Sequence, residues 1–324
     1  MIIILVLVCY GLLSNNNSKS CDASSHFYSH DNNKNNNNNS LFSGKSELDN
    51  NNNNNKTITI NNNDGHFLTI IVPSKGSHAE MQQNLFCYYE NLHLNSQLGE
   101  NNFEIIFVEQ FDDSIPFNRA MLMNIGSIYS NSKADYFVLT DIDLFPFQNT
   151  SYRYIDGIMG MHHMLCNYDQ FRQCNRPGGV SLGGVAKVSK TSWVNVNGMS
   201  NRFWGWGGED DELNIRVSHA KIPRHRDELS FFWHIDGIKP PGLRSEHLDY
   251  GKNVKIIGTS NSDSKYFKTD GLNQTISMLE RSDLVVMEKS FSFCRKIILN
   301  IKPCVKFENC TMTKNHTEKK KIKK

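Results

Sequence analysis

The sequence predicts an α/β fold in which a single domain contains a mostly parallel central sheet. Two observations support this prediction. Across the middle of the chain, short apolar runs alternate with stretches of helical periodicity, a pattern typical of parallel sheets that are covered on both faces. The chain also has 324 residues, 38% of them hydrophobic, and one low-complexity arm. That length suits one large domain, and a second full domain is not expected.

The two ends of the chain differ in composition from its middle. Residues 1–13 form an apolar run that is shorter than the roughly 20 residues needed to span a bilayer, so we interpret it as a signal peptide or a short anchor. Residues 14–65 are rich in Asn and Ser, which predicts a disordered stem. Residues 312–324 form a Lys-rich tail, typical of a solvated end. Residues 66–311 remain for the folded domain.

The charge balance narrows the class of partner. Lys and Arg number 35 against 33 Asp and Glu, which leaves a net charge of +2. A charge this small creates no global field that would attract nucleic acid or an anionic membrane. Small molecules or glycans are therefore the expected partners, nucleic acid is not, and membrane contact is expected only through an N-terminal anchor.

Cysteines and glycosylation sequences point to a compartment. Eight cysteines, among them a pair that brackets one loop and a group near the C-terminus, fit disulfides in an oxidising compartment. These are Cys166 and Cys174 in the loop, and Cys294, Cys304 and Cys310 near the end. Beyond a first Asn-x-Ser sequence in the Asn-rich arm, six further Asn-x-Ser/Thr sequences would be glycan acceptors if the chain were lumenal. They begin at Asn38, Asn55, Asn149, Asn273, Asn309 and Asn315.

The first half of the domain yields three strands and two helices. Apolar runs predict strands at Leu68–Pro73, Phe103–Val108 and Tyr136–Thr140, and periodicity predicts helices over Met81–Leu92 and Ala120–Tyr129. In open α/β sheets a ligand lies outside the carboxyl ends of the strands. The residues that directly follow these strands are therefore the first candidates for a site.

The second half yields three further elements. A strand is expected over Val180–Val185 and on to Val188–Lys190, and its paired glycines Gly183 and Gly184 either let a ligand come close or form a bulge. A helix is expected over Leu213–Ala220, and the apolar run Phe231–Asp236 follows it.

An Asp-x-Asp sequence directly follows the strand Tyr136–Thr140. Asp141 and Asp143 could together reach one hard divalent cation shared with the phosphate oxygens of a nucleotide diphosphate. The alternative is that a strand-terminal Asp caps the next turn. An isolated Asp-x-Asp leaves both interpretations open.

The run from Trp204 to Asp211 sets two tryptophans and three glycines before three acids. Glycines give the backbone freedom to close over a ligand, and the flat face of Trp206 suits a sugar ring. A carboxylate beside an aromatic wall can act as general base toward a hydroxyl. The acids also precede a helix, where they favour the helix dipole. Because capping alone does not require two tryptophans, we favour a closing sugar site.

His234 stands at the end of an apolar run, two residues before Asp236. A histidine in this position is either a hydrogen-bonded core residue or a metal ligand, and the His-x-Asp spacing leaves both interpretations open.

Four of these motifs resemble the beta-1,4-galactosyltransferase family in order and spacing. They are Phe117–Ala120 with Asn124–Gly126, Thr140–Pro146, Gly183–Val185 and Trp204–Asp211. The resemblance runs from about residue 68 to residue 272. It implies a nucleotide-sugar-binding fold of the glycosyltransferase A type, with residues 66–311 as the catalytic domain. The segment Asn197–Gly207 is similar to the branch of the family that adds galactose to xylose.

The resemblance implies an inverting transfer, assisted by Mn²⁺, of galactose from UDP-galactose to the 4-hydroxyl of an acceptor sugar. The acceptor would be xylose or N-acetylglucosamine on a glycoprotein or glycan. The Golgi lumen is the implied location, with secretion as the alternative.

Matching positions receive roles from the same resemblance. Asp210 would be the base, and Glu209 and Asp211 would orient the acceptor. The lid and acceptor residues would be Trp204, Trp206, Gly207 and Gly208. The donor would contact Pro73, Lys75, Phe117, Asn118, Arg119, Asp141, Ile142, Ser181, Gly183 and Gly184. Asp143 would bind the metal with His234, for which Asp236 and His247 are alternates.

Two departures from the family pattern bear on the donor. The family's arginine-rich stretch reads Ser74–Ser77 here, so phosphate or uridine contacts would rest on Lys75. Ser181 stands where galactose-specific members carry a tyrosine that crowds the sugar C2 substituent. The small side chain leaves room for an N-acetyl group, which makes UDP-N-acetylgalactosamine an alternative donor. A glycan-binding protein that has lost catalysis is the alternative from another functional class, and a metal-dependent phosphohydrolase is a third.

Overall fold

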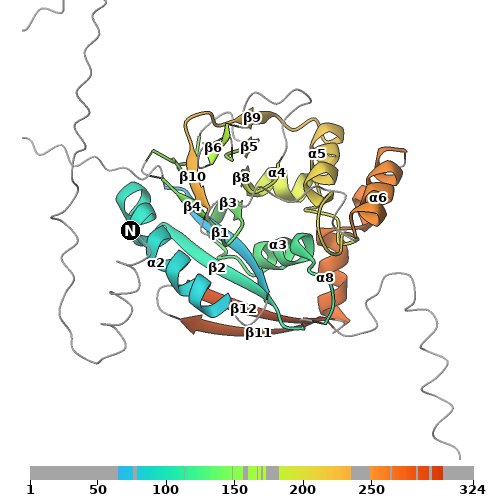
Figure 1. The fold of residues 1–324 in the computed structure, drawn as a ribbon, viewed down its shortest axis with the longest axis horizontal. Coiled ribbons are helices and arrows are strands. Elements are labelled where there is room, and N and C mark those ends of the chain that lie inside the picture. The colour runs from blue at the N-terminus through green and yellow to red at the C-terminus, as the bar shows by residue number, and fades with distance from the viewer. Residues whose placement is uncertain are drawn as a thin grey trace, which may run out of the picture. The chain divides into compact units, whose positions relative to one another are not determined.

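A mixed sheet of eight strands forms the centre of the part of the chain that the structure describes (Figure 1). This computed structural model describes residues 65–75, 79–112, 114–147, 149–155, 160–165, 167–168, 171–172, 182–234, 249–262, 265–281, 284–291 and 294–301. The expectations for the N-terminal segment, the stem and the Lys-rich tail lie outside these residues. None of the described helices is long and apolar enough to cross a membrane.

The strands and helices have the following bounds. The strands are β1 (Phe67–Lys75), β2 (Phe103–Gln110), β3 (Ala134–Thr140), β4 (Leu144–Pro146), β5 (Met161–His163), β6 (Asn167–Tyr168), β7 (Phe171–Arg172), β8 (Val185–Ser189), β9 (Arg224–Arg226), β10 (Phe231–His234), β11 (Leu284–Phe291) and β12 (Cys294–Ile301). The helices are α2 (Ala79–Leu98), α3 (Arg119–Ile128), α4 (Lys190–Asn195), α5 (Glu209–His219), α6 (Tyr250–Ser262), α7 (Tyr266–Thr269) and α8 (Leu272–Glu280).

The strand order confirms the predicted mostly parallel sheet. The order is β11-β12-β2-β1-β3-β8-β5-β9, and β12, β2, β1 and β3 are parallel neighbours. β11 and β8 join this group in antiparallel fashion, and β5 pairs antiparallel with β8 and parallel with β9. β4, β10, β6 and β7 form a smaller second sheet.

Helices on both faces explain why the strands are apolar throughout. Alternate residues of β1 face opposite sides: Leu68, Ile70 and Val72 pack with α2, whereas Ile71 packs with α3. Gly126 lets α3 approach the sheet closely, since a Cβ atom there would lie 2.3 Å from Ile71 Cγ2. Because β1 is buried on both faces, neither face needs polar side chains, and its sequence is a continuous apolar run.

Most predicted elements are present, and one strand is shorter than predicted. The strand expected over Val180–Val185 begins only at Val185 and continues to Ser189. The prediction was wrong for Leu182 to Gly184, because Gly184 has φ +71° and turns the backbone out of the extended conformation. The helix expected from Leu213 begins four residues earlier, at Glu209.

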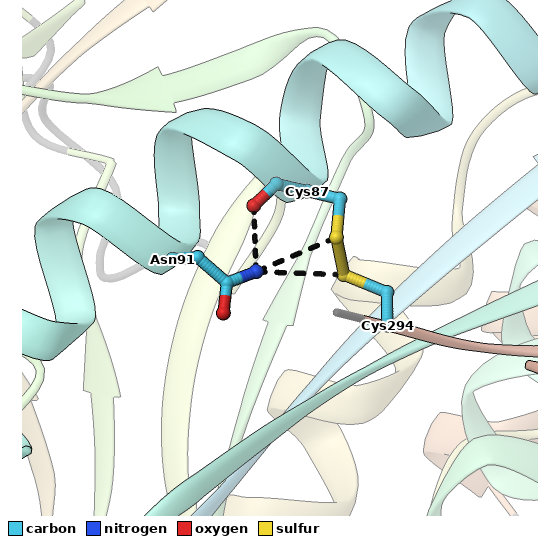
Figure 2. Close-up of a disulfide and its surroundings, with 3 residues drawn as sticks. All are labelled: Cys87, Asn91 and Cys294. Carbon is cyan, nitrogen blue, oxygen red and sulfur yellow. Dashed lines mark hydrogen bonds between the residues drawn. A yellow bond between two sulfur atoms is a disulfide. The ribbon is translucent and has the colours of Figure 1, made fainter. Parts of the chain in front are cut away.

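A disulfide joins α2 to the last described strand. Cys87 of α2 and Cys294 of β12 are 207 residues apart in sequence. Asn91 lies beside the bond, and its Nδ2 donates to Cys87 O at 2.7 Å (Figure 2). This pairing joins Cys294 to a cysteine outside the two groups noted in the sequence. The other members of those groups lie outside the described residues.

Removing this disulfide is expected to destabilise the domain. The variant carrying both Cys87→Ser and Cys294→Ser should lose about 2–5 kcal/mol of unfolding free energy, because the bridge closes a long loop in the unfolded chain. Urea denaturation of the oxidised variant and wild type measures the loss. Wild type kept in a reducing agent should match the variant, and equal stability of all three samples would contradict the prediction.

Glu90 makes the stability of the domain depend on pH. It is fully buried on α2, where Tyr152 Oη donates to its Oε1 at 3.2 Å. Burial raises the pKa of Glu90 from 4.5 to about 8. The folded state therefore holds the proton longer than the unfolded state. Protonated Glu90 therefore contributes to the free energy of unfolding. This contribution is fully present below pH 4.5 and is lost as the pH rises toward 8.

Replacing Glu90 by Gln should remove this dependence. The amide fills the same space, keeps an acceptor for Tyr152 and carries no titrating proton. By linkage, wild type should lose about 5 kcal/mol more than Glu90→Gln across that window. Urea denaturation at pH 5, 6, 7 and 8 tests this, and parallel stability curves for the two proteins would refute it.

Candidate active site

A cavity of about 460 Å³ opens at the carboxyl ends of β1 and β3. This is the edge at which α/β proteins bind ligands. Its walls come from the end of β1, the segment after β3, the start of α3, the glycines before β8, and the first turn of α5 with the residues that lead into it. The predicted site residues on these walls are Pro73, Lys75, Phe117, Arg119, Asp141, Ile142, Asp143, Gly183, Gly184, Trp206, Gly207, Gly208, Glu209, Asp210 and Asp211.

The first acid of the Asp-x-Asp sequence, Asp141, is paired with an arginine. Arg119 Nε donates to Asp141 Oδ1 at 2.6 Å, and Arg119 Nη2 donates to Gly184 O at 3.3 Å. The guanidinium of Arg119 therefore links the residue that follows β3 to the backbone of Gly184. That both acids reach one cation stays a prediction, although one oxygen of Asp141 is paired with Arg119. Asp143 remains the better candidate for a metal ligand.

Arg119 is the positive centre of an acidic wall. Its Nη1 lies 3.8 Å from Glu209 Oε1, and 12% of its side chain is exposed. Burial opposes the charge of the guanidinium, but Asp141, Glu209 and Asp210 outweigh burial and raise the pKa of Arg119 above its ordinary value. It stays cationic and offsets part of the repulsion among the acids.

The environment of Glu209 favours the protonated form of its carboxyl group. Burial raises the pKa of Glu209 to about 7, the charge of Asp210 adds to the rise, and Arg119 opposes it. Its Oε2 is buried and has no hydrogen-bond partner among the described residues. A buried oxygen in this state is suited to bind a hydroxyl of a ligand, since an unsatisfied buried acceptor is costly.

The helix that carries the acids starts at a glycine in the left-handed region. Gly208 is the N-cap of α5, with φ 95° and no side-chain capping bond. Glu209, Asp210 and Asp211 fill the first turn, where the helix dipole favours negative charge. The acids therefore begin a helix and also line the cavity, whereas closure over a sugar stays a prediction.

The glycines before α5 line the cavity, in the segment that we expect to act as its lid. We call residues 203–208 the lid. Gly205 has φ 76°, and a Cβ atom there would lie 2.1 Å from Asp249 Oδ2. Trp206 is 37% exposed, and its ring centroid lies 5.9 Å from that of Tyr250. A large exposed indole on a glycine-rich segment can cover a sugar and move with the backbone.

No sequence pattern indicates that Asn253 holds the lid. This residue lies on α6 and is 2% exposed. Its Nδ2 donates to Gly207 O at 2.8 Å, to Trp206 O at 3.1 Å and to Trp204 O at 3.3 Å. The side-chain amide of Asn253 thus holds three carbonyl groups of the lid, although Asn253 lies 46 residues after Gly207 in the sequence. Tyr250, also on α6, lines the cavity and was likewise not predicted.

Asp270 anchors both ends of the lid. It accepts from Asn201 N at 2.9 Å and from Arg202 Nε at 3.0 Å, just before the lid. It also accepts from Ser200 Oγ. On the far side it accepts from Arg216 Nη2 at 3.3 Å, within α5. A single buried carboxylate therefore positions the segment that precedes the lid and the helix that follows it.

Two predicted residues lie behind the cavity wall. The Oδ1 of Asn118 accepts from Met121 N and caps α3, and its Nδ2 donates to Asn201 O at 2.8 Å. Trp204 packs against the hydrophobic core. Asn118 and Trp204 therefore support the site from behind and do not line it. Ser181, Asp236, His247 and the side chain of His234 lie outside the described residues.

The donor set partly fits a manganese ion. Asp143 lines the cavity, and the pairing of β10 with β4 places the backbone of His234 opposite Leu144, the next residue. Carboxylate oxygen and imidazole nitrogen are both metal ligands in proteins. Among the residues that the structure describes, no three His, Cys, Asp or Glu side chains group to hold a metal.

Comparison with known proteins identifies the family. The family model for the N-terminal region of glycosyl transferase group 7 matches residues 47–155, and the model for the N-terminal domain of galactosyltransferase matches residues 162–235. The chain belongs to the beta-1,4-galactosyltransferase family. Beta-1,4-galactosyltransferase 4 of Mus musculus is 29% identical over 64% of this chain and 57% of its own length. Beta-1,4-galactosyltransferase 7 of Drosophila melanogaster is 32% identical over 48% of this chain and 46% of its own length.

Solved structures support the fold of this galactosyltransferase family member. The catalytic domain of Drosophila beta1,4galactosyltransferase 7, in complex with xylobiose, has a TM-score of 0.53 and 23% identity over 72% of this chain and 93% of that one. A mutant of the same enzyme, complexed with manganese, UDP-Gal and xylobiose, has a TM-score of 0.51. The chain spans about half the length of the curated relatives it matches. The likeness confirms the glycosyltransferase A-type fold expected from the motifs.

Proposed function

We propose that the chain transfers galactose from UDP-galactose, with inversion, to the 4-hydroxyl of an acceptor sugar. The observation that supports this most is the convergence of the lid, the acids of α5 and the Asp-x-Asp segment on one cavity. An inverting transfer needs a base on the acceptor side and charge stabilisation on the side of the departing diphosphate. The acids of α5 can supply the first, and the edge that holds Arg119 and Asp143 can supply the second.

Each residue of the cavity then has a role. Asp210 removes the proton of the acceptor hydroxyl. Glu209, with its buried oxygen, and Asp211 orient the acceptor. Trp206 covers the sugars and, with the lid, excludes water that would compete with the acceptor.

On the donor side, the end of β1 and the start of α3 would hold the nucleotide. Pro73 and Phe117 offer apolar surface at the cavity wall. The Nζ of Lys75 donates to Ile115 O, which holds the ammonium near the same wall. Asp143 and His234 would hold manganese, whose charge would neutralise the diphosphate oxygens.

The proposed location is the lumen of the secretory pathway, most simply the Golgi. The disulfide between Cys87 and Cys294 supports this, because structural disulfides form in oxidising compartments.

A transfer assay tests the proposal. UDP-galactose and UDP-N-acetylgalactosamine are each offered with a beta-xyloside or a beta-N-acetylglucosaminide, with manganese or with a chelator. These conditions follow from the ligands of the Drosophila enzyme and from the small Ser181. We expect product that depends on manganese from UDP-galactose. A folded protein that binds UDP and gives no product with any pair would favour a glycan-binding protein.

A further inference from the structure

An exposed aromatic surface lies on the small sheet, outside the cavity. Phe147, Leu229, Phe231 and Trp233 form it, and we call it the aromatic patch. Phe147 is 40% exposed, Trp233 is 45% exposed and Leu229 is 77% exposed. The three rings contact one another, with centroids 5.6 to 6.2 Å apart. Contiguous apolar surface of this kind usually has an occupant.

A glycosylation sequence adjoins this patch. Asn149, Thr150 and Ser151 form an Asn-x-Ser sequence. Asn149 is exposed, and its Nδ2, the atom that would carry a glycan, donates to Leu229 O at 2.5 Å. The attachment atom therefore lies against the backbone of a patch residue. A glycosylated Asn keeps one N–H, so this hydrogen bond can persist after modification.

The local backbone brings Asn149 and Phe147 together. Thr150 N donates to Phe147 O at 2.9 Å and closes a turn between them. Thr150 is buried, and its Oγ1 donates to Phe231 O at 2.7 Å, which fixes the turn to β10. Ser151, whose hydroxyl the glycosylation sequence requires, is exposed. The turn thus presents an acceptor amide and an aromatic ring two residues apart.

We propose that Asn149 carries an N-linked glycan whose first N-acetylglucosamine packs on the aromatic patch. The C–H groups on one face of a sugar ring carry partial positive charge and suit the negative face of an aromatic ring. The sugar covers apolar surface that would otherwise face water, and its polar edge remains solvated. The glycan thereby stabilises the folded domain.

The modification has a simple chemical balance. Asn149 Nδ2 forms a bond to C1 of the sugar, and the bond from C1 to the diphosphate of an isoprenoid-linked oligosaccharide breaks. One amide proton is released, and the isoprenoid diphosphate leaves. The host's oligosaccharide-transferring enzyme would catalyse this step, which rests on the proposed passage through the secretory pathway.

Secretory expression of the full chain in eukaryotic cells tests the site. Peptide mass spectrometry should find Asn149 occupied, and Ser151→Ala should abolish that glycan without altering the asparagine. Ser151→Thr is the matched control, because it preserves the sequence and should preserve the glycan. An unmodified Asn149 beside other glycosylated asparagines would overturn this proposal alone. A chain without any N-glycan would also contradict the proposed location, and neither outcome affects the transfer assay.

Thermal unfolding tests the packing. Ser151→Ala should lower Tm by about 2–4 °C in the wild-type background, and trimming the glycan to one sugar should preserve most of the wild-type Tm. In a Phe147→Ala background, Ser151→Ala should change Tm much less, because the sugar no longer has the ring of Phe147 to pack on. Equal shifts in both backgrounds would overturn the proposal. Dimerisation of the glycosylated chain that Phe147→Ala abolishes would also overturn it, since a second copy would then cover the patch.

Discussion

Asp210→Asn should reduce sugar transfer by at least about 10³-fold while leaving UDP binding within a few-fold of wild type. The amide is nearly isosteric and keeps the first turn of α5, but it cannot take the proton of the acceptor hydroxyl. Initial rates with saturating donor, together with calorimetric UDP binding, measure the two effects. Of the roles proposed for Asp210, the proton acceptor is the one that this change removes.

One control variant makes the Asp210 result interpretable. Asp112→Asn alters an exposed carboxylate that binds Ser114 in a surface turn, and it should leave the rate unchanged. Transfer by Asp210→Asn within a few-fold of wild type would assign the base elsewhere. Glu209 would then be the next candidate, because it has a buried free oxygen and a pKa of about 7.

Asp270→Ala should lower the free energy of unfolding by about 3–5 kcal/mol, because it removes one of the two carboxylates that pair with a buried arginine. Arg216 is fully buried, and its Nε still donates to Glu212 at 2.8 Å. The Nη2 of Arg216 loses the carboxylate of Asp270, and the Nε of Arg202 loses its hydrogen bond to the same carboxylate. Urea denaturation at neutral pH measures the change.

The same substitution should also impair transfer at temperatures where the variant is folded. Asp270 does not line the cavity, so its effect would come through the lid, as a lower kcat with UDP affinity largely kept. Asp270→Asn retains an acceptor oxygen and should restore part of the rate. Glu288→Ala breaks an exposed pair with Arg295 and serves as the control, with a cost under about 1 kcal/mol. A normal kcat in Asp270→Ala would show that its role is structural only.

The fold was predictable because its signals are local in sequence. The apolar run of β1 and the helical period of α3 each identify an element without knowledge of its neighbours. Parallel pairing then brings the ends of β1 and β3 to one edge. The bound at Val185 was missed because a left-handed glycine, Gly184, looks in sequence like any other small residue within a strand.

The site was predictable only where its residues lie in continuous motifs. The lid and the acids of α5 are adjacent in sequence, so their joint role could be inferred. Asn253 and Asp270 act on the lid from 46 to 70 residues away, and no local pattern marks an amide or a carboxylate for such a task. The pairing of Cys87 with Cys294 was hidden for the same reason.

The place of β12 in the sheet has a consequence for biosynthesis. β12 lies between β2 and β11, and it pairs in parallel with β2, some 190 residues earlier in the chain. While the ribosome is still synthesising the domain, the outer edge of β2 stays open, and open strand edges promote association between chains. A chain terminated before Cys294 would keep that edge permanently and could not form the bond to Cys87. Premature termination before β12 should therefore yield an aggregating product that quality control removes, even though every proposed catalytic residue has already been made.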